Sequence, residues 1–243
     1  MAVNPLADPS ARIVIAHRGA SSDAAENTMA AFALAAALGV DGFELDVRRS
    51  ADGVAVVVHD PTLERTTSLS GPVAARTAVE LARVEIPSLA EVLDAFPSMA
   101  VLIEVKETEV QSATADAIRR ANASARCVMA SAHHRALADF RVPPFLVGAS
   151  GQDISRAWFR ALVGLGPRGR HAAPDYVCAS VPWRHRGLTV PSRRFVNALH
   201  TRGVAVHVWT VDDEATALLL WRRGVNGIVT NHAARILQTR SHA

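Results

Sequence analysis

The stretch Ile13-Val14-Ile15-Ala16-His17-Arg18-Gly19 places an apolar run directly before a histidine and an arginine. The same arrangement returns twice downstream. Gly42-Phe43 leads into Glu44-Leu45-Asp46, and the run 54–58 leads into His59-Asp60. Glu44 and Asp46 are two residues apart, so on a strand they share one face. Buried strands that deliver polar groups from their C-terminal ends are typical of a parallel-sheet active site.

Outward from this stretch, the chain repeats a short apolar run, a polar loop and a helical segment. This pattern predicts core strands at 13–16, 42–47, 101–105, 127–130, 145–148, 176–179, 204–209 and 227–230. It predicts helices at 27–38, 78–83, 88–96, 110–121, 134–140, 154–165, 192–202, 213–223 and 232–238. An extra strand at 54–58 follows the turn Asp52-Gly53 and predicts a projecting hairpin. A loop rich in Gly, Pro, Arg and His is expected at 166–174.

Eight strand-then-helix units predict an α/β fold with a parallel sheet. Their number predicts closure into a (β/α)₈ TIM barrel, for which 243 residues are close to the usual length of about 250. No linker divides the chain, so we expect a single domain over 1–243. Residues 60–87 do not fit a barrel unit and are expected to form a short insertion after the second barrel strand.

Composition narrows the class of protein. Hydrophobic residues make up 49% of the chain, enough for a sizeable core and too many for a disordered segment. No run approaches the roughly 18 apolar residues of a membrane helix, and residues 1–8 do not resemble a secretory signal. We therefore expect a cytoplasmic protein without stable membrane insertion. Cys127 and Cys178 lie in apolar runs and are expected to be buried free thiols.

The net charge of +3 comes from scattered arginines rather than from a basic tract, which argues against nucleic-acid binding. The chain contains 25 arginines but a single lysine, Lys106. No pattern indicates an oligomeric state.

In a barrel of this type, the loops after the strands form one open end, here called the mouth. The side chains expected there are His17, Glu44, Asp46, His59, Glu104, Lys106, Trp209 and Asn231. Three neighbouring carboxylates repel one another unless a cation lies between them, and an oxygen-rich site suits Mg²⁺ or Ca²⁺. The alternative is that these acids form salt bridges with nearby arginines.

His17 and His59 are candidates for metal ligands or for a general acid and base, with a purely structural role as the alternative. A metal, a base and an acid together suit a phosphodiesterase. Arg18 supplies a bidentate grip on phosphate. Without Arg18, a metal-assisted carbonyl reaction would fit nearly as well.

The chain resembles the glycerophosphodiester phosphodiesterase family. The matching motifs run in the family's order over residues 13 to about 232. They are Ala16-His17-Arg18-Gly19, Glu26-Asn27-Thr28, Phe43-Glu44-Leu45-Asp46-Val47, Val58-His59-Asp60-Pro61-Thr62-Leu63-Glu64-Arg65-Thr66-Thr67, Ile86-Pro87-Ser88-Leu89, Ile103-Glu104-Val105-Lys106, Val208-Trp209-Thr210-Val211 and Gly224-Val225-Asn226-Gly227-Ile228-Val229-Thr230-Asn231.

The resemblance implies metal-dependent hydrolysis of small-molecule glycerophosphodiesters to glycerol 3-phosphate and an alcohol, with the glycerol 2-hydroxyl as a possible internal nucleophile. It implies one divalent cation, Mg²⁺ or Ca²⁺. The implied roles are metal binding by Glu44, Asp46 and Glu104, acid–base catalysis by His17 and His59, substrate and phosphate binding by Arg18, Lys106 and Trp209, and support by Glu26 and Asn27.

The chain departs from the family pattern in three places. Ala25 replaces a usual Pro, the stretch 130–134 replaces a usual Ser-Ser-Phe, and Asn231 stands where Asp is common. The departure at 130–134 removes an aromatic from the mouth and leaves the roles of His133 and His134 open, as is the role of Asn231. These departures bear on the alcohol side of the substrate rather than on the phosphoryl chemistry.

Two other functions remain alternatives on this fold. A lysophospholipase D acting on a lipid-bearing diester needs an apolar surface at the mouth, and the insertion offers only scattered Leu63, Leu69, Val73 and Val79. Water-soluble diesters are therefore the preferred expectation. A non-catalytic glycerol-phosphate-binding barrel could lose a histidine or carboxylate freely, yet both histidines and all three carboxylates are present.

Overall fold

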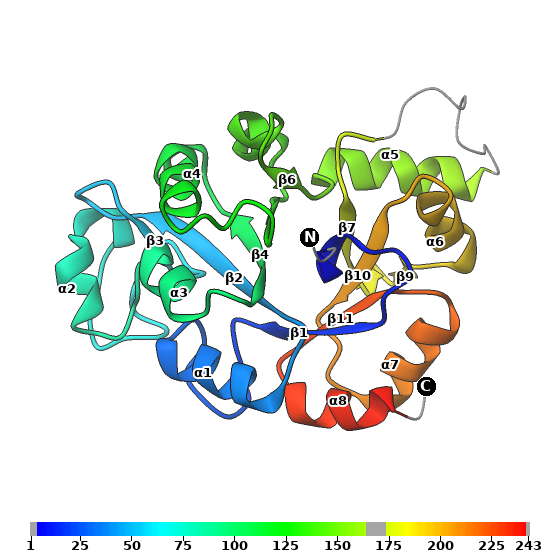
Figure 1. Ribbon diagram of the computed structural model, residues 1–243, viewed down its shortest axis with the longest axis horizontal. Coiled ribbons are helices and arrows are strands. Elements are labelled where there is room, and N and C mark those ends of the chain that lie inside the picture. Colours follow the sequence, from blue (N-terminus) through cyan, green and yellow to red (C-terminus); the bar gives the residue numbers. More distant parts are fainter. Residues whose placement is uncertain (1–3, 164–173, 242–243) are drawn as a thin grey trace.

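The computed structural model describes residues 4–163 and 174–241. Eight parallel strands form the wall of a barrel, as predicted (Figure 1). In sheet order they are β6 (Leu146–Val147), β5 (Cys127–Ala130), β4 (Ala100–Val105), β2 (Gly42–Arg49), β1 (Ile13–His17), β11 (Gly227–Thr230), β10 (Ala205–Trp209) and β7 (Cys178–Pro182).

The barrel closes between β6 and β7. The Val177 amide donates to the Val147 carbonyl at 2.8 Å, and the Ala149 amide donates to the Cys178 carbonyl at 2.7 Å. A parallel bridge between Gly148 and Cys178 lies between these two bonds. The short β6 therefore joins both ends of the sheet into a ring, so all strand C-termini open on one mouth.

Helices surround the ring of strands (Figure 1). They are α1 (Met29–Leu38), α3 (Leu89–Ala95), α4 (Gln111–Arg120), α5 (Gly151–Leu162), α6 (Arg193–His200), α7 (Glu214–Arg222) and α8 (Ala233–Arg240). Local sequence sets their ends. Thr28 caps α1 by accepting from the Ala31 amide, and Gly39 ends it in the left-handed conformation. None of the helices in the described part of the chain is long and apolar enough to cross a bilayer.

The insertion lies where the sequence predicts it. Strand β3 (Ala55–Val57) pairs antiparallel with the end of β2, and a short 3₁₀ helix (Val73–Ala75) and α2 (Ala78–Ala82) follow. Leu63 and Val73 are fully buried in a small separate core that also contains Val56 and Leu81. The buried apolar residues of the insertion thus stabilise the insertion itself.

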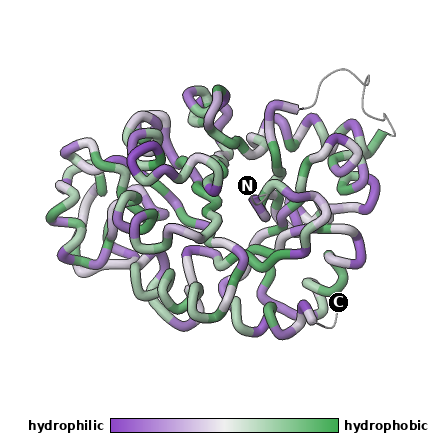
Figure 2. The backbone as a smooth tube through the Cα atoms, viewed as in Figure 1, coloured by the Kyte–Doolittle hydropathy of each residue, from purple (hydrophilic) through white to green (hydrophobic). Residues whose placement is uncertain are grey.

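Two layers make up the main core, and the central strands are mostly apolar (Figure 2). Outward-facing strand residues pack against the helices, whereas Ile15, Leu102, Val128 and Val229 fill the barrel with Leu6 of the N-terminal 3₁₀ helix (Pro5–Ala7). Cys127 and Cys178 are buried free thiols, as expected, and burial raises the pKa of each to about 12.

The structure corrects the predicted elements in three places. The strand predicted at 176–179 begins two residues later, at Cys178. The helix predicted at 134–140 is a 3₁₀ helix. A small hairpin of β8 (Arg184–His185) and β9 (Leu188–Thr189) was not predicted at all. The predicted loop at 166–174 and the end of the helix at 154–165 lie almost entirely outside the described residues.

Candidate active site

The turn after β1 begins the site. Arg18 has a left-handed backbone with φ of 56°, which is unusual for a residue with a side chain. This conformation lets its amide donate to the Glu44 carbonyl on the neighbouring strand at 2.9 Å. Gly19 follows with φ of 81°, and a Cβ there would lie 2.7 Å from Ala31 of α1. The close approach requires glycine, so the motif His17-Arg18-Gly19 is set by backbone geometry.

Strands β2 and β4 bring three carboxylates together, here called the acid cluster: Glu44, Asp46 and Glu104. One oxygen from each lies within 4.8 Å of the others. Asp46 and Glu104 are register partners on adjacent strands, which explains their proximity. Lys106 Nζ lies 2.8 Å from Asp46 Oδ1 and 2.8 Å from Glu104 Oε2. The predicted metal ligands therefore meet in space, with a lysine against two of them.

Charge is distributed unevenly over the acid cluster. Burial and the negative charges of Asp46 and Glu104 raise the pKa of Glu44 well above its ordinary value. Burial alone would also raise the pKa of Asp46, but the positive charges of Lys106 and Arg18 hold it below its ordinary value. Burial alone would lower the pKa of Lys106, yet Asp46 and Glu104 raise it. Glu44 is thus the carboxylate whose charge is least compensated.

His17 is held by a chain of hydrogen bonds from the last barrel strand. Its Nδ1 lies 2.7 Å from Asn231 Oδ1, and Asn231 Nδ2 donates to Asp212 Oδ2 at 2.8 Å. Burial alone would raise the pKa of Asp212, but hydrogen bonds from Asn231 and Thr230 hold it below its ordinary value. His17 Nε2 points the other way, 3.8 Å from Glu44 Oε2. Burial lowers the pKa of His17.

His59 is held in a similar way, but by a charged partner. Its Nδ1 lies 2.6 Å from Asp60 Oδ1. Hydrogen bonds from Arg65 and His59 hold the pKa of Asp60 far below its ordinary value. Arg65 also donates from both terminal nitrogens to Glu26, at 2.7 and 2.9 Å.

Glu26 and Asn27, predicted as supporting residues, contact the groups around the acid cluster. Arg18 Nη1 donates to Glu26 Oε1 at 2.9 Å, and Arg18 Nε lies 3.2 Å from Asp46 Oδ2. Asn27 Nδ2 donates to the same Asp46 oxygen at 3.0 Å. An alternating series of charges therefore connects Asp46 through Arg18, Glu26, Arg65 and Asp60 to His59.

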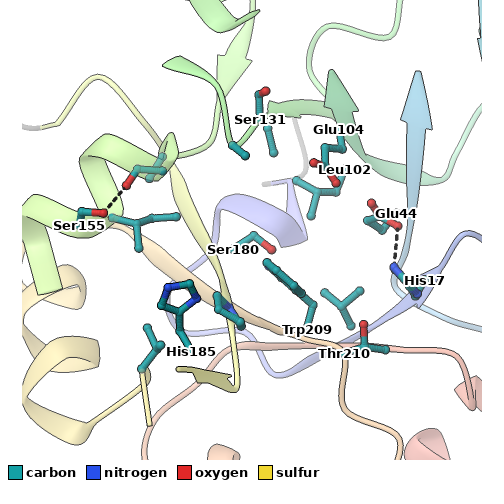
Figure 3. A pocket seen from close by; sticks show the side chains of 18 of the residues that line it. His17, Glu44, Leu102, Glu104, Ser131, Ser155, Ser180, His185, Trp209 and Thr210 are labelled. Carbon is teal, nitrogen blue, oxygen red and sulfur yellow. Dashed lines mark hydrogen bonds and ion pairs between the residues drawn. The ribbon is translucent and has the colours of Figure 1, made fainter. Parts of the chain in front are cut away.

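These groups surround one cavity of about 850 Å³ at the mouth. Its lining includes most of the predicted site residues: His17, Arg18, Glu44, His59, Glu104, Lys106 and Trp209. Asp46, Asn27 and Asn231 lie behind this lining. Figure 3 shows His17 and Glu44 on one side of the cavity, Ser155 and His185 on the other, and Trp209 between them.

The side of the cavity away from the acid cluster is apolar. Ile154, Trp158 and Phe159 of α5 line it together with Leu188 of the β8–β9 hairpin, and we call these four residues the apolar wall. The expectation that the mouth lacks an apolar surface is therefore wrong. The surface comes from α5 and the hairpin and not from the insertion, where Leu63 and Val73 are buried, Leu69 is partly buried, and the exposed Val79 does not line the cavity.

Sequence reasoning assigned no role to three residues that hold the histidines: Asp60, Arg65 and Asp212. Asp60 could have been found from its place beside His59, but Arg65 and Asp212 reach the site only through folding. His133 is exposed and is not among the residues that line the cavity. His134 Nδ1 lies 3.0 Å from Ser150 Oγ, the cap of α5.

Comparisons with known proteins show the family to which the chain belongs. Residues 17–235 match the model of the glycerophosphoryl diester phosphodiesterase family. A probable glycerophosphodiester phosphodiesterase 2 of Mycobacterium tuberculosis is 36% identical over 91% of this chain and 88% of its own length. A glycerophosphodiester phosphodiesterase of Caldanaerobacter subterraneus is 30% identical over 90% of this chain and 93% of its own.

Solved structures share the fold. The glycerophosphoryl diester phosphodiesterase domain of a Mycobacterium tuberculosis protein superposes with a TM-score of 0.83 at 21% identity, over 95% of this chain and 100% of that one. An Oleispira antarctica phosphodiesterase, solved with the product sn-glycerol-3-phosphate, gives 0.76 at 24% identity, over 95% and 97%. With the family match over residues 17–235, the chain belongs to the glycerophosphoryl diester phosphodiesterase family and is an enzyme of that class.

Proposed function

We propose that the chain hydrolyses glycerophosphodiesters to glycerol 3-phosphate and an alcohol, using one divalent cation and an acid–base pair of histidines. The observation that carries this proposal is the meeting of His17, His59 and the acid cluster at one cavity. The product bound in the Oleispira antarctica phosphodiesterase supports glycerol 3-phosphate as the product here.

The donor set fits a hard cation. Glu44, Asp46 and Glu104 would hold it through carboxylate oxygens, the ligands that Mg²⁺ and Ca²⁺ prefer. The raised pKa of Glu44 supports this, because it reflects buried negative charge that Lys106 and Arg18 leave uncompensated. When bound, the cation would polarise a phosphoryl oxygen and offset negative charge in the transition state.

The two histidines have different partners and therefore different roles. The Asp212 carboxylate can only accept, so Asn231 turns Nδ2 towards it and Oδ1 towards His17. His17 then carries its proton on Nδ1 and offers the lone pair of Nε2, as a general base requires. His59 Nδ1 lies 2.6 Å from the carboxylate of Asp60, which fixes the orientation of the ring at the cavity. We assign His17 as the base and His59 as the acid.

Arg18 and Lys106 complete the site by binding the phosphate. Both line the cavity beside the acid cluster, and both carry donors suited to phosphate oxygens. Glu26 and Asn27 hold Arg18 and Asp46 in place. Trp209 lies at the cavity's centre, where it would contact the substrate beside the phosphate.

The test is an assay on glycerophosphocholine with glycerol 3-phosphate detection. EDTA should abolish activity, and Mg²⁺ or Ca²⁺ should restore it. His17→Ala and His59→Ala should each lower kcat by about 10²- to 10⁴-fold. Metal binding, followed by calorimetry, should survive in both variants but fail in Glu44→Gln. His133→Ala is the matched control and should behave as wild type. Full activity in excess EDTA, or near-normal turnover by either site variant, would contradict the proposal.

The ring tautomer gives a second readout. The ¹⁵N shifts of the His17 ring in the resting enzyme should report a proton on Nδ1. Asp212→Ala should remove this preference, because the Asn231 amide then loses the acceptor that orients it. An unchanged tautomer in that variant would show that Asp212 does not orient His17.

A further inference from the structure

The apolar wall has no use in phosphoryl chemistry. Ile154 and Trp158 are one helical turn apart on α5, and Phe159 adjoins them, so an apolar stripe of this helix faces the cavity. Leu188 adds to the stripe from the β8–β9 hairpin. Helices on a barrel ordinarily bury such a stripe against the strands. On α5, Ile154 and Trp158 are half-buried against the core but also line the cavity that holds the proposed catalytic groups, and Phe159 lines it while largely exposed.

Large side chains of this region are open to solvent. Phe159 is 59% exposed, Leu188 is 58% exposed and Trp209 is 43% exposed. Apolar residues that gather on an exposed concave surface mark a binding surface rather than a core. The small residues Ala132 and Ala149 line the same cavity and leave room between α5 and the strands. At about 850 Å³, the cavity is near the upper end of the range of about 300–1,000 Å³ for small-molecule pockets.

Charge indicates which part of a substrate the wall would bind. Among the residues that the structure describes, the carboxylates that line the cavity are Glu44 and Glu104, and both belong to the acid cluster. Beside Leu188 the charged or ionisable lining residues are His185 and Arg186, on the same hairpin. A cationic head group such as choline would meet a positive guanidinium there with no carboxylate from the wall. A neutral hydrocarbon chain can pack against both the aromatic and the aliphatic side chains of the apolar wall.

We infer that the apolar wall binds the hydrocarbon chain of the substrate, so that the preferred glycerophosphodiesters carry an acyl or alkyl chain. This inference rests on the proposed function and deepens it. The chain can be attached to the glycerol, as in a lysophospholipid, or to the leaving alcohol. Either attachment leaves the phosphate at Arg18 and Lys106 while the chain extends past Trp209 along α5.

The experiment compares glycerophosphocholine with two chain-length series, all below their critical micelle concentrations and with the preferred metal. One series is 1-acyl-glycerophosphocholines of 4 to 10 carbons, and the other is glycerophospho-1-alkanols of the same lengths. In one series or both, kcat/KM should rise with each methylene, by up to about fourfold where the methylene is fully buried. The responding series identifies the end of the diester that carries the chain.

Phe159→Ser and Leu188→Ser should flatten this rise, and should lower kcat/KM less for glycerophosphocholine than for the long-chain members of the responding series. Both side chains are more than half exposed, so neither change removes core packing. Val79→Ser is the matched control, because Val79 is 66% exposed on α2 and is not among the residues that line the cavity. It should retain the full chain-length dependence.

Three results would overturn the inference. The first is a kcat/KM that is independent of chain length in both series. The second is a chain-length dependence that survives in both wall variants. The third is an equal loss of glycerophosphocholine turnover in those variants, which would assign the wall to the head group. If neither glycerophosphocholine nor any member of the two series is hydrolysed, the proposed function fails independently of the inference. Tryptophan fluorescence titrations then decide the inference: decyl phosphate should bind at least tenfold more tightly than ethyl phosphate, and Phe159→Ser should remove the difference.

Discussion

Among single side chains, Lys106 is singled out twice, by the composition of the chain and by its position against the acid cluster. It is the one lysine beside 25 arginines, and its ammonium lies 2.8 Å from carboxylate oxygens of both Asp46 and Glu104. An ammonium is a compact charge, whereas guanidinium is a wide planar fork. We predict that Lys106→Arg lowers kcat at least tenfold, which is about 1.4 kcal/mol of transition-state stabilisation. Steady-state kinetics with the melting temperature as a companion measurement checks this.

The control for this substitution replaces an arginine by a lysine at a site outside the cavity. Arg119→Lys changes an exposed arginine of α4 that pairs with Asp116 one helical turn away. It should leave kcat and the melting temperature unchanged, because a lysine can keep both the exposed ion pair and the place over the Phe145 ring, which the guanidinium occupies at 5.0 Å. A fully active Lys106→Arg enzyme would mean that the lone lysine is an accident of composition.

Which residues sequence reasoning can find depends on where their partners lie. Glu44 and Asp46, or Glu104 and Lys106, alternate along one strand, so the two-residue period of the strand alone directs each pair to one face. Asp212 and Arg65 act through partners 19 and 39 residues away, Asn231 and Glu26. Such contacts depend on how strand ends and loops meet, and no local spacing specifies that.

Among the elements, the insertion has a connecting function besides its own small core. Arg65 links Glu26, in the loop after β1, to Asp60, which holds His59. Without this link the His59 ring loses its fixed orientation. We predict that Arg65→Ala lowers kcat about tenfold while metal binding, followed by calorimetry, stays unchanged.

Arg76→Ala provides the comparison within the same insertion. Arg76 makes a surface pair with Glu80 at 4.0 Å, and its removal should change neither kcat nor stability by a measurable amount. Equal losses in the two variants would indicate a general effect of charge in the insertion and not a specific link to His59.

The barrel was predictable because each of its strands is a buried apolar run followed by a helical pattern. The β8–β9 hairpin was not, because strands of two residues each leave no periodic pattern to detect. The sequence pattern of α5 indicates an apolar helix face, but it does not indicate which part of the barrel that face contacts. Only the assembled barrel shows that this face meets the mouth.

For the protein as a whole, we expect the stability to vary with pH through His207, a histidine that is not among the residues lining the cavity. His207 is fully buried inside the barrel, and Gly227 leaves room for its ring, since a Cβ there would lie 2.6 Å away. Burial lowers the pKa of His207 from 6.5 to about 4. As pH falls through 6.5, the unfolded chain binds a proton that the folded protein does not. The free energy of unfolding should therefore decrease, by about 3 kcal/mol once pH 4 is reached.

Urea unfolding at pH 7 and pH 5 checks this expectation. Between these values the wild type should lose about 2 kcal/mol more than His207→Leu, in which the titrating ring is absent. The difference between the two proteins isolates His207 from the other groups that titrate in this range. An identical loss in both would show that the ring finds a partner or water when protonated.

Both imidazoles are tied through Nδ1 to partners behind the cavity wall, and this has a consequence for repeated turnover. If His17 is the base and His59 the acid, as proposed, direct attack by water leaves the proton of the attacking oxygen on His17 and removes one from His59. Neither Asn231 nor Asp60 can carry the proton across, because each holds its own ring from outside. For direct attack by water, the two rings are therefore reset by proton exchange with solvent in the emptied cavity. Product release thus empties the cavity and also lets the two histidines return to their starting protonation states.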